Sequence, residues 1–112
     1  MKKLSKKDRV PDSKRFSIVT EKMDRCYICN RSGDLKAEDF RFKLWLHEVF
    51  GGSGKRELSK YYGLVVPLCM ECHENVHKKK DDATALKQVG QKFFEVHYPN
   101  EDFIDVFGRN YL

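Results

Sequence analysis

Two short segments in the middle of the chain have the character of β-strands. Over residues 40–46, Phe and Leu side chains occupy every second position, so a strand here would bury one face and expose the other. Residues 64–68 form a continuous apolar run, and Pro67 near its end fits a short strand at a sheet edge. We predict a strand at each segment, with His47 and Glu48 at the end of the first, where a loop begins.

Helical periodicity follows the second of these strands. A helix that begins at Met70 would place His73 and His77, which lie four residues apart, on one face. A second helix is predicted over residues 83–97, and Pro99 would end it. Its apolar face would be formed by four residues at helical spacing, Leu86, Val89, Phe93 and Val96.

The remaining segments are predicted to be an arm, a loop and a C-terminal turn. Residues 1–20 carry many Lys and Arg and few apolar side chains, which predicts a flexible basic arm. Residues 51–56 are predicted to form a flexible basic loop. They do not form a phosphate-binding P-loop, because the glycines are not followed by Gly-Lys-Ser/Thr and no helical pattern starts there. Residues 101–107 are expected to pack back on the core as a short apolar helix or turn. The pattern as a whole predicts an α+β domain over residues 21–112 with C-terminal helices.

Length and charge narrow the class of protein. The chain has 112 residues, which indicates one small domain that gains from a metal or crosslink, and its formal net charge is +5. Lys and Arg outnumber Asp and Glu in residues 1–60, whereas acidic residues are slightly more numerous in residues 61–112. The basic half is the expected face for nucleic acid, although a solvated surface has the same composition. Five basic residues are the candidate phosphate contacts, Lys55, Arg56, Lys78, Lys79 and Lys80.

The four cysteines form two Cys-x-x-Cys pairs, and a histidine directly follows the second. The pairs are Cys26 with Cys29 and Cys69 with Cys72, a spacing typical of a four-thiolate zinc site. Zinc bound in this way is coordinatively closed, so it stabilises the fold and does not hydrolyse a substrate. A redox motif and disulfides are the alternatives, and the absence of an apolar signal segment disfavours disulfides.

A second group of metal-binding residue types surrounds the second cysteine pair in sequence. His47 and Glu48 lie between the two pairs, and His73 and His77 share the predicted helix. A neutral imidazole can bind a divalent ion or act as a general base. The pattern predicts a chemically open site beside the closed zinc site. The alternatives are a role for His73 at the zinc itself and a plain surface position for His77.

In this order of strand, His-Glu, loop, strand, Cys-x-x-Cys-His-x-x-x-His and helix, the chain resembles the HNH endonuclease superfamily with its ββα-metal fold. More narrowly, it resembles the small HNH-type proteins of phages and prophages. The resemblance covers about residues 24–112. It is carried by both cysteine pairs, residues 46–52 (LHEVFGG), Lys55-Arg56 with Ser59, residues 62–64 (YGL), residues 68–77 and residues 107–112 (FGRNYL).

The resemblance implies a DNA endonuclease that nicks or cuts DNA by metal-dependent phosphodiester hydrolysis. Zn²⁺ would be structural, and Mg²⁺, Mn²⁺ or Ni²⁺ would be the catalytic ion. His73 matches the last histidine of the HNH pattern, and His77 matches a second helix ligand of colicin-type relatives. His47 is either a ligand of the ion, with Glu48 as the base, or the base itself, with Glu48 as a ligand or orienting group. The implied catalytic residues are His47, Glu48 and His73, and the implied ligands of the catalytic ion are His47, His73 and His77.

One position departs from the family pattern. The position nine residues before His73 holds Leu64, where the family has an Asn that orients the catalytic histidine. A non-catalytic zinc-binding module that binds nucleic acid, or a regulator on a degenerate HNH scaffold, explains this residue better and is the alternative function. The resemblance also implies a location in the cytoplasm of a bacterial host cell. No segment approaches the run of about 20 apolar residues that a membrane span needs, so no membrane partner is expected.

Overall fold

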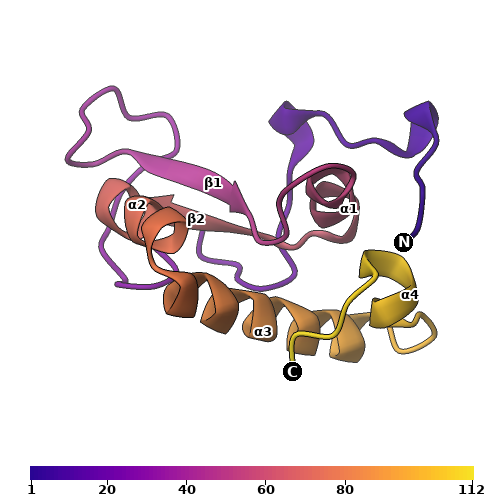
Figure 1. Ribbon diagram of the computed structural model, residues 1–112. Coiled ribbons are helices and arrows are strands. Elements are labelled where there is room, and N and C mark those ends of the chain that lie inside the picture. Colours follow the sequence, from indigo (N-terminus) through magenta and orange to yellow (C-terminus); the bar gives the residue numbers. More distant parts are fainter.

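A two-stranded antiparallel sheet lies at the centre of the fold in the computed structural model, which describes residues 1–112. β1 (Leu44–Glu48) pairs with β2 (Val65–Cys69) so that Leu44 is opposite Cys69 and His47 is opposite Val66. Figure 1 shows α2 beside this hairpin and the long α3 running beneath it. The α+β class predicted from the sequence is confirmed. Its four helices are α1 (Lys55–Tyr62), α2 (Met70–Lys78), α3 (Lys80–His97) and α4 (Phe103–Phe107).

The first strand begins later than the alternating pattern predicts. The chain turns just before it, because the N–H groups of Phe42 and Lys43 both donate to the carbonyl oxygen of Asp39, each at 3.0 Å. Phe40 and Phe42 are therefore exposed, at 67% and 56%, and the prediction that they share a buried face is wrong. Backbone pairing with β2 starts only at Leu44, so alternation alone could not locate the strand end.

The basic loop predicted over residues 51–56 is also corrected, because a helix begins inside it. α1 starts at Lys55, directly after Gly54, and is followed by Gly63. These two glycines have φ values of 80° and 75°, a backbone conformation that glycine adopts without strain. Leu58 and Tyr62 lie one turn apart on α1 and are almost completely buried. With only eight residues, this helix is too short for its periodicity to stand out in the sequence.

The predicted second strand and the helix that follows it are both present. β2 is buried along its whole length, as a continuous apolar run predicts. The carbonyl oxygen of Pro67 accepts the N–H of Tyr27 at 2.8 Å, which ties the turn of the first cysteine pair to β2. β2 ends at Cys69, which is also the N-cap of α2. Strand and helix therefore meet inside the second cysteine pair.

The long helix α3 begins at Lys80, earlier than predicted, and buries only part of the predicted face. Leu86 is buried and Val89 packs against the core, as predicted, but Val96 is 82% exposed and Phe93 is 38% exposed, so these two positions of the predicted apolar face are wrong. Gly90 belongs to the true face, where its missing side chain allows the helix to approach Phe50. Although α3 has 18 residues, no helix in the protein combines the length and apolar character that crossing a membrane requires. The buried residues of α3 are Leu86, Gly90, Gln91 and Phe94.

An aromatic core joins the loop after β1 to three helices. The ring of Phe50 lies 5.3 Å from that of Phe103 and 4.7 Å from that of Phe107 in α4. Tyr62 in α1 contacts Phe94 in α3 at a centroid distance of 5.0 Å. Such aromatic pairs each contribute about 0.5–1.5 kcal/mol beyond the burial of their surface. The core thereby holds the residues that follow His47 and Glu48 in place. The short C-terminal helix expected over residues 101–107 is confirmed as α4, and it packs on this core.

Residues 1–20 lie against α1 and α4 and contain two short 3₁₀ turns (indigo in Figure 1). The backbone N–H of Lys2 donates to the carbonyl of Val106 at 2.9 Å, and its ammonium group donates to the hydroxyl of Tyr62 at 2.9 Å. The N–H of Ile18 donates to the carbonyl of Gly63 at 2.8 Å. These contacts place the arm beside the domain, while its flexibility stays a prediction.

Ser59 fastens α1 to the residue that follows the first strand. Its hydroxyl is completely buried, accepts the N–H of Phe50 at 3.0 Å and donates to the carbonyl of Phe50 at 2.8 Å. We predict that Ser59→Ala lowers the free energy of unfolding by about 1–3 kcal/mol in urea denaturation, because two buried backbone groups lose their partner. Ser53→Ala is the matched control at an exposed loop position and should change it by less than about 0.5 kcal/mol. Equal effects of the two substitutions would contradict this role.

Candidate functional site

The four cysteines are assembled into one cluster, as their spacing predicts. Their Sγ atoms all lie within 4.8 Å of one another, and all four are free thiols rather than disulfides. Sγ of Cys29 is 3.7 Å from Sγ of Cys69. Two corners of a zinc tetrahedron with Zn–S bonds of about 2.3 Å would be about 3.8 Å apart. The cluster can therefore hold a metal such as zinc. Its members are Cys26 and Cys29 from the first turn, Cys69 at the end of β2 and Cys72 in α2.

The electrostatics of the cluster also suit a cation. Burial raises the pKa values of Cys69 and Cys72. Burial would raise the pKa of Cys26 as well, but backbone N–H groups, above all that of Cys29, hold it at about 7. Thiols this close cannot all ionise without a neighbouring positive charge. A divalent ion supplies that charge, so the donor set fits a bound metal.

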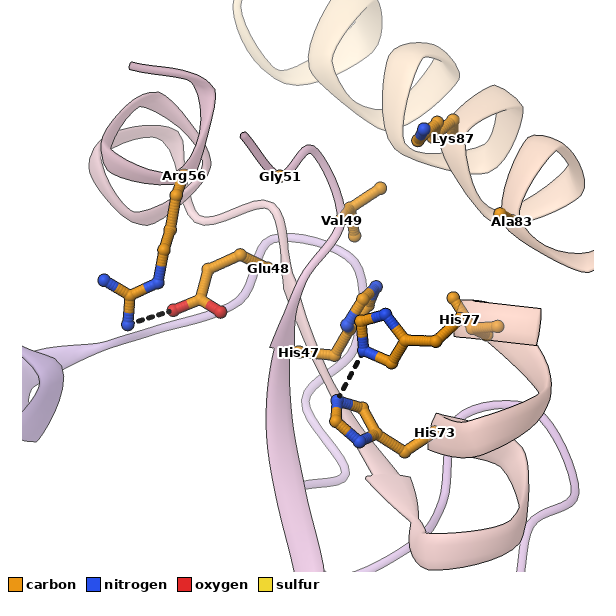
Figure 2. A pocket seen from close by; sticks show the side chains of 10 residues that line it. His47, Glu48, Val49, Gly51, Arg56, His73, His77, Ala83 and Lys87 are labelled. Atoms are coloured by element: carbon orange, nitrogen blue, oxygen red, sulfur yellow. Dashed lines mark hydrogen bonds and ion pairs between the residues drawn. The ribbon is translucent and has the colours of Figure 1, made fainter. Parts of the chain in front are cut away.

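Three histidines form a second cluster beside the hairpin. His47 comes from β1, while His73 and His77 come from successive turns of α2, and one ring nitrogen of each lies within 4.8 Å of the others. Figure 2 shows the three imidazoles turned toward one another. Nε2 of His73 is 3.3 Å from Nε2 of His77. Metal–nitrogen bonds of about 2.0–2.1 Å in a tetrahedron would set this separation at about 3.3 Å.

Two of the imidazoles, those of His47 and His73, are in the protonation state that metal binding requires. Burial lowers the pKa of His47 to about 4, and the nearby His73, His77 and Lys87 act in the same direction. Burial, followed by the neighbouring His77, also lowers the pKa of His73. Both rings are therefore neutral at pH 7, with lone pairs available for an ion.

The histidine cluster opens into a pocket of about 480 Å³, in contrast to the closed thiol cluster. Three nitrogen donors leave at least one coordination position free on a divalent ion, which is the arrangement of catalytic rather than structural metal sites. Ten residues line this pocket: the three histidines, Glu48, Val49, Gly51, Arg56, Val76, Ala83 and Lys87.

Glu48 does not join the three imidazoles. Figure 2 shows its side chain directed toward Arg56 and away from the histidines. Its Oε1 atom is 3.1 Å from Nη1 of Arg15 and 3.3 Å from Nη2 of Arg56. Both arginines contact the same oxygen, and Oε2 has no protein partner. Of the two alignments considered for His47 and Glu48, this geometry groups His47 with the metal ligands.

The structure separates the candidate phosphate contacts into two kinds. Arg56 is surrounded by carboxylates, since it pairs with Asp12 and Glu57 as well as with Glu48. Lys55 is half-buried and donates to the hydroxyl of Tyr111 at 3.4 Å. Three candidates are exposed at the junction of α2 and α3 and form no ion pair, Lys78, Lys79 and Lys80.

Two residues at the site were not singled out from the sequence. Arg15 appeared only as one charge among many in the predicted arm, and no local pattern connects it to Glu48. Lys87 lies far from His47 in sequence and reaches the pocket only because α3 packs across α2. Helical spacing offers the one available signal, because Lys87 and Ala83 are four residues apart and both line the pocket.

Leu64 occupies the position where the resembled family has an Asn. It is completely buried, and its carbonyl oxygen accepts the N–H of Val49 at 2.9 Å. Its side chain belongs to the hydrophobic core and supplies no hydrogen bond to an imidazole. Orientation of His47 therefore depends on the strand and on its neighbouring rings.

Comparisons with known proteins identify no relative of this chain. No protein-family description, no curated protein and no solved structure matches the chain. The function is therefore argued from the geometry of the two clusters.

We predict that the purified protein holds one tightly bound zinc per chain on its thiols. Cobalt substituted for zinc should give thiolate-to-metal charge-transfer absorption, and chelation should lower the free energy of unfolding by several kcal/mol, because binding and folding are coupled. Cys72→Ser should lose both signatures. His77→Ala is the matched control on the same helix and should keep them. Loss of the thiolate signal in the histidine variant would show that the two clusters share one ion.

The half-buried His47 predicts a loss of stability in acid. An unfolded chain protonates this histidine near pH 6.5, but the folded chain does so only near pH 4, so falling pH favours unfolding between these values. Without added divalent ions, the wild type should lose up to about 3 kcal/mol more than His47→Gln over this window, since one pKa unit corresponds to about 1.4 kcal/mol. Urea denaturation at a series of pH values measures the difference. Parallel curves would mean that His47 is readily protonated in the fold.

Proposed function

We propose that this protein is a metal-dependent DNA endonuclease of the HNH type, which nicks or cuts DNA by phosphodiester hydrolysis. The observation that carries the proposal is the convergence of three imidazoles on an open pocket, separate from a closed four-thiol cluster. The order of β1, β2 and α2 around the histidines supports a ββα-metal arrangement. A zinc held only by thiolates has no role in hydrolysis, so the open pocket is the place for chemistry.

His47, His73 and His77 fit a divalent ion, and such an ion would stabilise the charge that develops on the phosphate and the leaving oxygen. Imidazole suits Ni²⁺ better than Mg²⁺, which prefers oxygen ligands, with Mn²⁺ able to serve as well. The ring of His47 is neutral without help from a carboxylate, since burial lowers its pKa. These residues act as ligands in the proposal, which leaves the role of base to another group.

Glu48 is the proposed general base. Arg15 and Arg56 hold its Oε1 atom, which orients the free Oε2 atom at the wall of the pocket (Figure 2). Oε2 would accept a proton from the attacking water, a contribution worth about 10²- to 10⁴-fold in rate for a positioned base. Arg15 and Arg56 are positioning residues in this scheme, because they act through Glu48.

DNA is the proposed partner, and the exposed Lys78, Lys79 and Lys80 beside the pocket are its proposed phosphate contacts. Their charge is free of carboxylate partners, in contrast to that of Arg56. The phage or prophage setting and the cytoplasm of a bacterial host remain part of the proposal on the resemblance alone.

A non-catalytic nucleic-acid-binding or regulatory module is the second candidate. It is favoured by one observation, the buried Leu64 where an orienting Asn would stand. Such a module would use the thiol cluster and the exposed lysines but would have no use for an open histidine pocket.

We predict divalent-dependent nicking of supercoiled plasmid, strongest with Ni²⁺ or Mn²⁺. His73→Ala should reduce the rate by about 10²-fold or more, because it removes a ligand of the proposed catalytic ion. Nicking is followed by gel electrophoresis on identically purified proteins. His97→Ala is the matched control, since His97 is exposed at the end of α3, outside both clusters, and this variant should cut at the wild-type rate.

In the same assay Glu48→Gln should bind the ion normally and nick slowly, which separates the base from the ligands. Equal residual nicking by wild type and His73→Ala would indicate a contaminating nuclease and remove the support for catalysis. No nicking, with plasmid still retarded in a gel, would favour the binding module.

A further inference from the structure

The side chains that line the histidine pocket include two cations, Arg56 and Lys87, and one carboxylate, so they carry an excess of positive charge apart from any bound ion. Its only carboxylate is Glu48, and that group is already shared by Arg15 and Arg56. No acidic side chain remains among the lining residues to balance a divalent ion or a further cation. A site built in this way attracts an anion, because the ligand supplies the missing negative charge.

Lys87 is a cation of the pocket whose ammonium group has no acidic partner in the protein. It lies on α3, is half-buried, and forms neither an ion pair nor a hydrogen bond within the protein. Its ammonium group is 5.7 Å from the centre of the Tyr111 ring, a weak cation–π contact that leaves its hydrogen-bond donors free. A lysine can lie along apolar surface with its stem while the ammonium group stays accessible, so the charge of Lys87 is available to a ligand.

The position of Lys87 directs it to the same pocket as the imidazoles. Figure 2 places Lys87 and Ala83 on the α3 wall, facing the wall that carries His47 and His77. Ala83 is one turn before Lys87 and has a small side chain, so the space in front of the ammonium group stays open.

We propose that Lys87 and the histidine cluster together form a phosphate subsite, in which the Lys87 ammonium binds an oxygen of a phosphate group that enters the pocket. This inference rests on the proposed function, and it assigns Lys87 as the contact to the phosphodiester that is cut. A phosphate has several oxygens in a tetrahedron, so one can face α3 while another faces the imidazoles. A pocket of about 480 Å³ accommodates such a group.

The subsite depends on the C-terminal part of the chain. Lys87 belongs to α3, which lies outside the hairpin and α2 that supply the histidines. Because α3 is held by the packing of Phe94 on Phe103 and of Gly90 on Phe50, the lysine has a fixed place opposite the rings. A phosphate bound in this pocket would therefore contact both α3 and the histidine cluster, which are separate in sequence.

The test measures binding of inorganic phosphate by isothermal titration calorimetry to the full chain, with its thiol zinc in place and Ni²⁺ added. The wild type should bind phosphate, and Lys87→Gln should bind it about 10- to 100-fold more weakly, the usual loss for one charge-assisted hydrogen bond. Lys87→Arg should restore much of the affinity. Lys92→Gln is the matched control on the same helix, at an exposed position outside the pocket, and should bind like the wild type.

Nickel stoichiometry and thermal unfolding of each variant show that the site and the fold are intact. Equal phosphate affinity in wild type, Lys87→Gln and Lys92→Gln would overturn the subsite, as would the absence of phosphate binding by the wild type. Plasmid nicking distinguishes this failure from that of the proposed function. If the wild type nicks DNA and Lys87→Gln is equally fast with an unchanged KM, only the subsite fails. If phosphate binds through Lys87 but no variant nicks, the subsite stands and the endonuclease proposal fails.

Discussion

The convergence of four thiols at the start of α2 is the constraint on which the rest of the structure depends. Cys69 ends β2 and Cys72 lies in the first turn of α2, so the cluster fixes both the end of the hairpin and the direction of the helix. An α-helix rotates by a fixed angle per residue, so the position of Cys72 also sets the direction of His73 and His77, which face β1. The arrangement of the four thiols therefore also determines the geometry of the histidines.

In the proposed function, the thiol cluster stabilises the fold and the histidine cluster carries out the chemistry. The thiol set is closed by four donors, three of which are buried, whereas the histidine set has three donors and an open side. Cations outnumber carboxylates among the residues that line the open side, and the one carboxylate there, Glu48, is paired with two arginines. The arm supplies Arg15, so a segment that composition alone describes as a basic tail contributes to the wall of the site.

Features that depend on local spacing could be predicted from the sequence, and features that depend on packing could not. Cysteines three residues apart and histidines four residues apart bring their side chains together through one turn or one helix, independently of the rest of the fold. The strand start at Leu44 depends on a turn at Asp39, and the buried face of α3 depends on Gly90, which has no side chain for an apolar pattern to record. Arg15 and Lys87 reach the site only through contacts between segments that are distant in sequence.

The position of α3 gives the open pocket a second wall, which a site formed by the three imidazoles alone would lack. The hairpin and α2 alone would expose the three imidazoles to solvent. No side chain would then lie opposite the imidazoles to contact the other side of a ligand. Packing of α3 against α2 adds a wall whose small Ala83 keeps the space open and whose Lys87 carries an unpaired charge. A metal and an ammonium group on opposite walls favour a ligand with several anionic oxygens over one with a single carboxylate oxygen or none. The charge distribution of the pocket thus supports the proposed phosphate subsite independently of the order of elements along the chain.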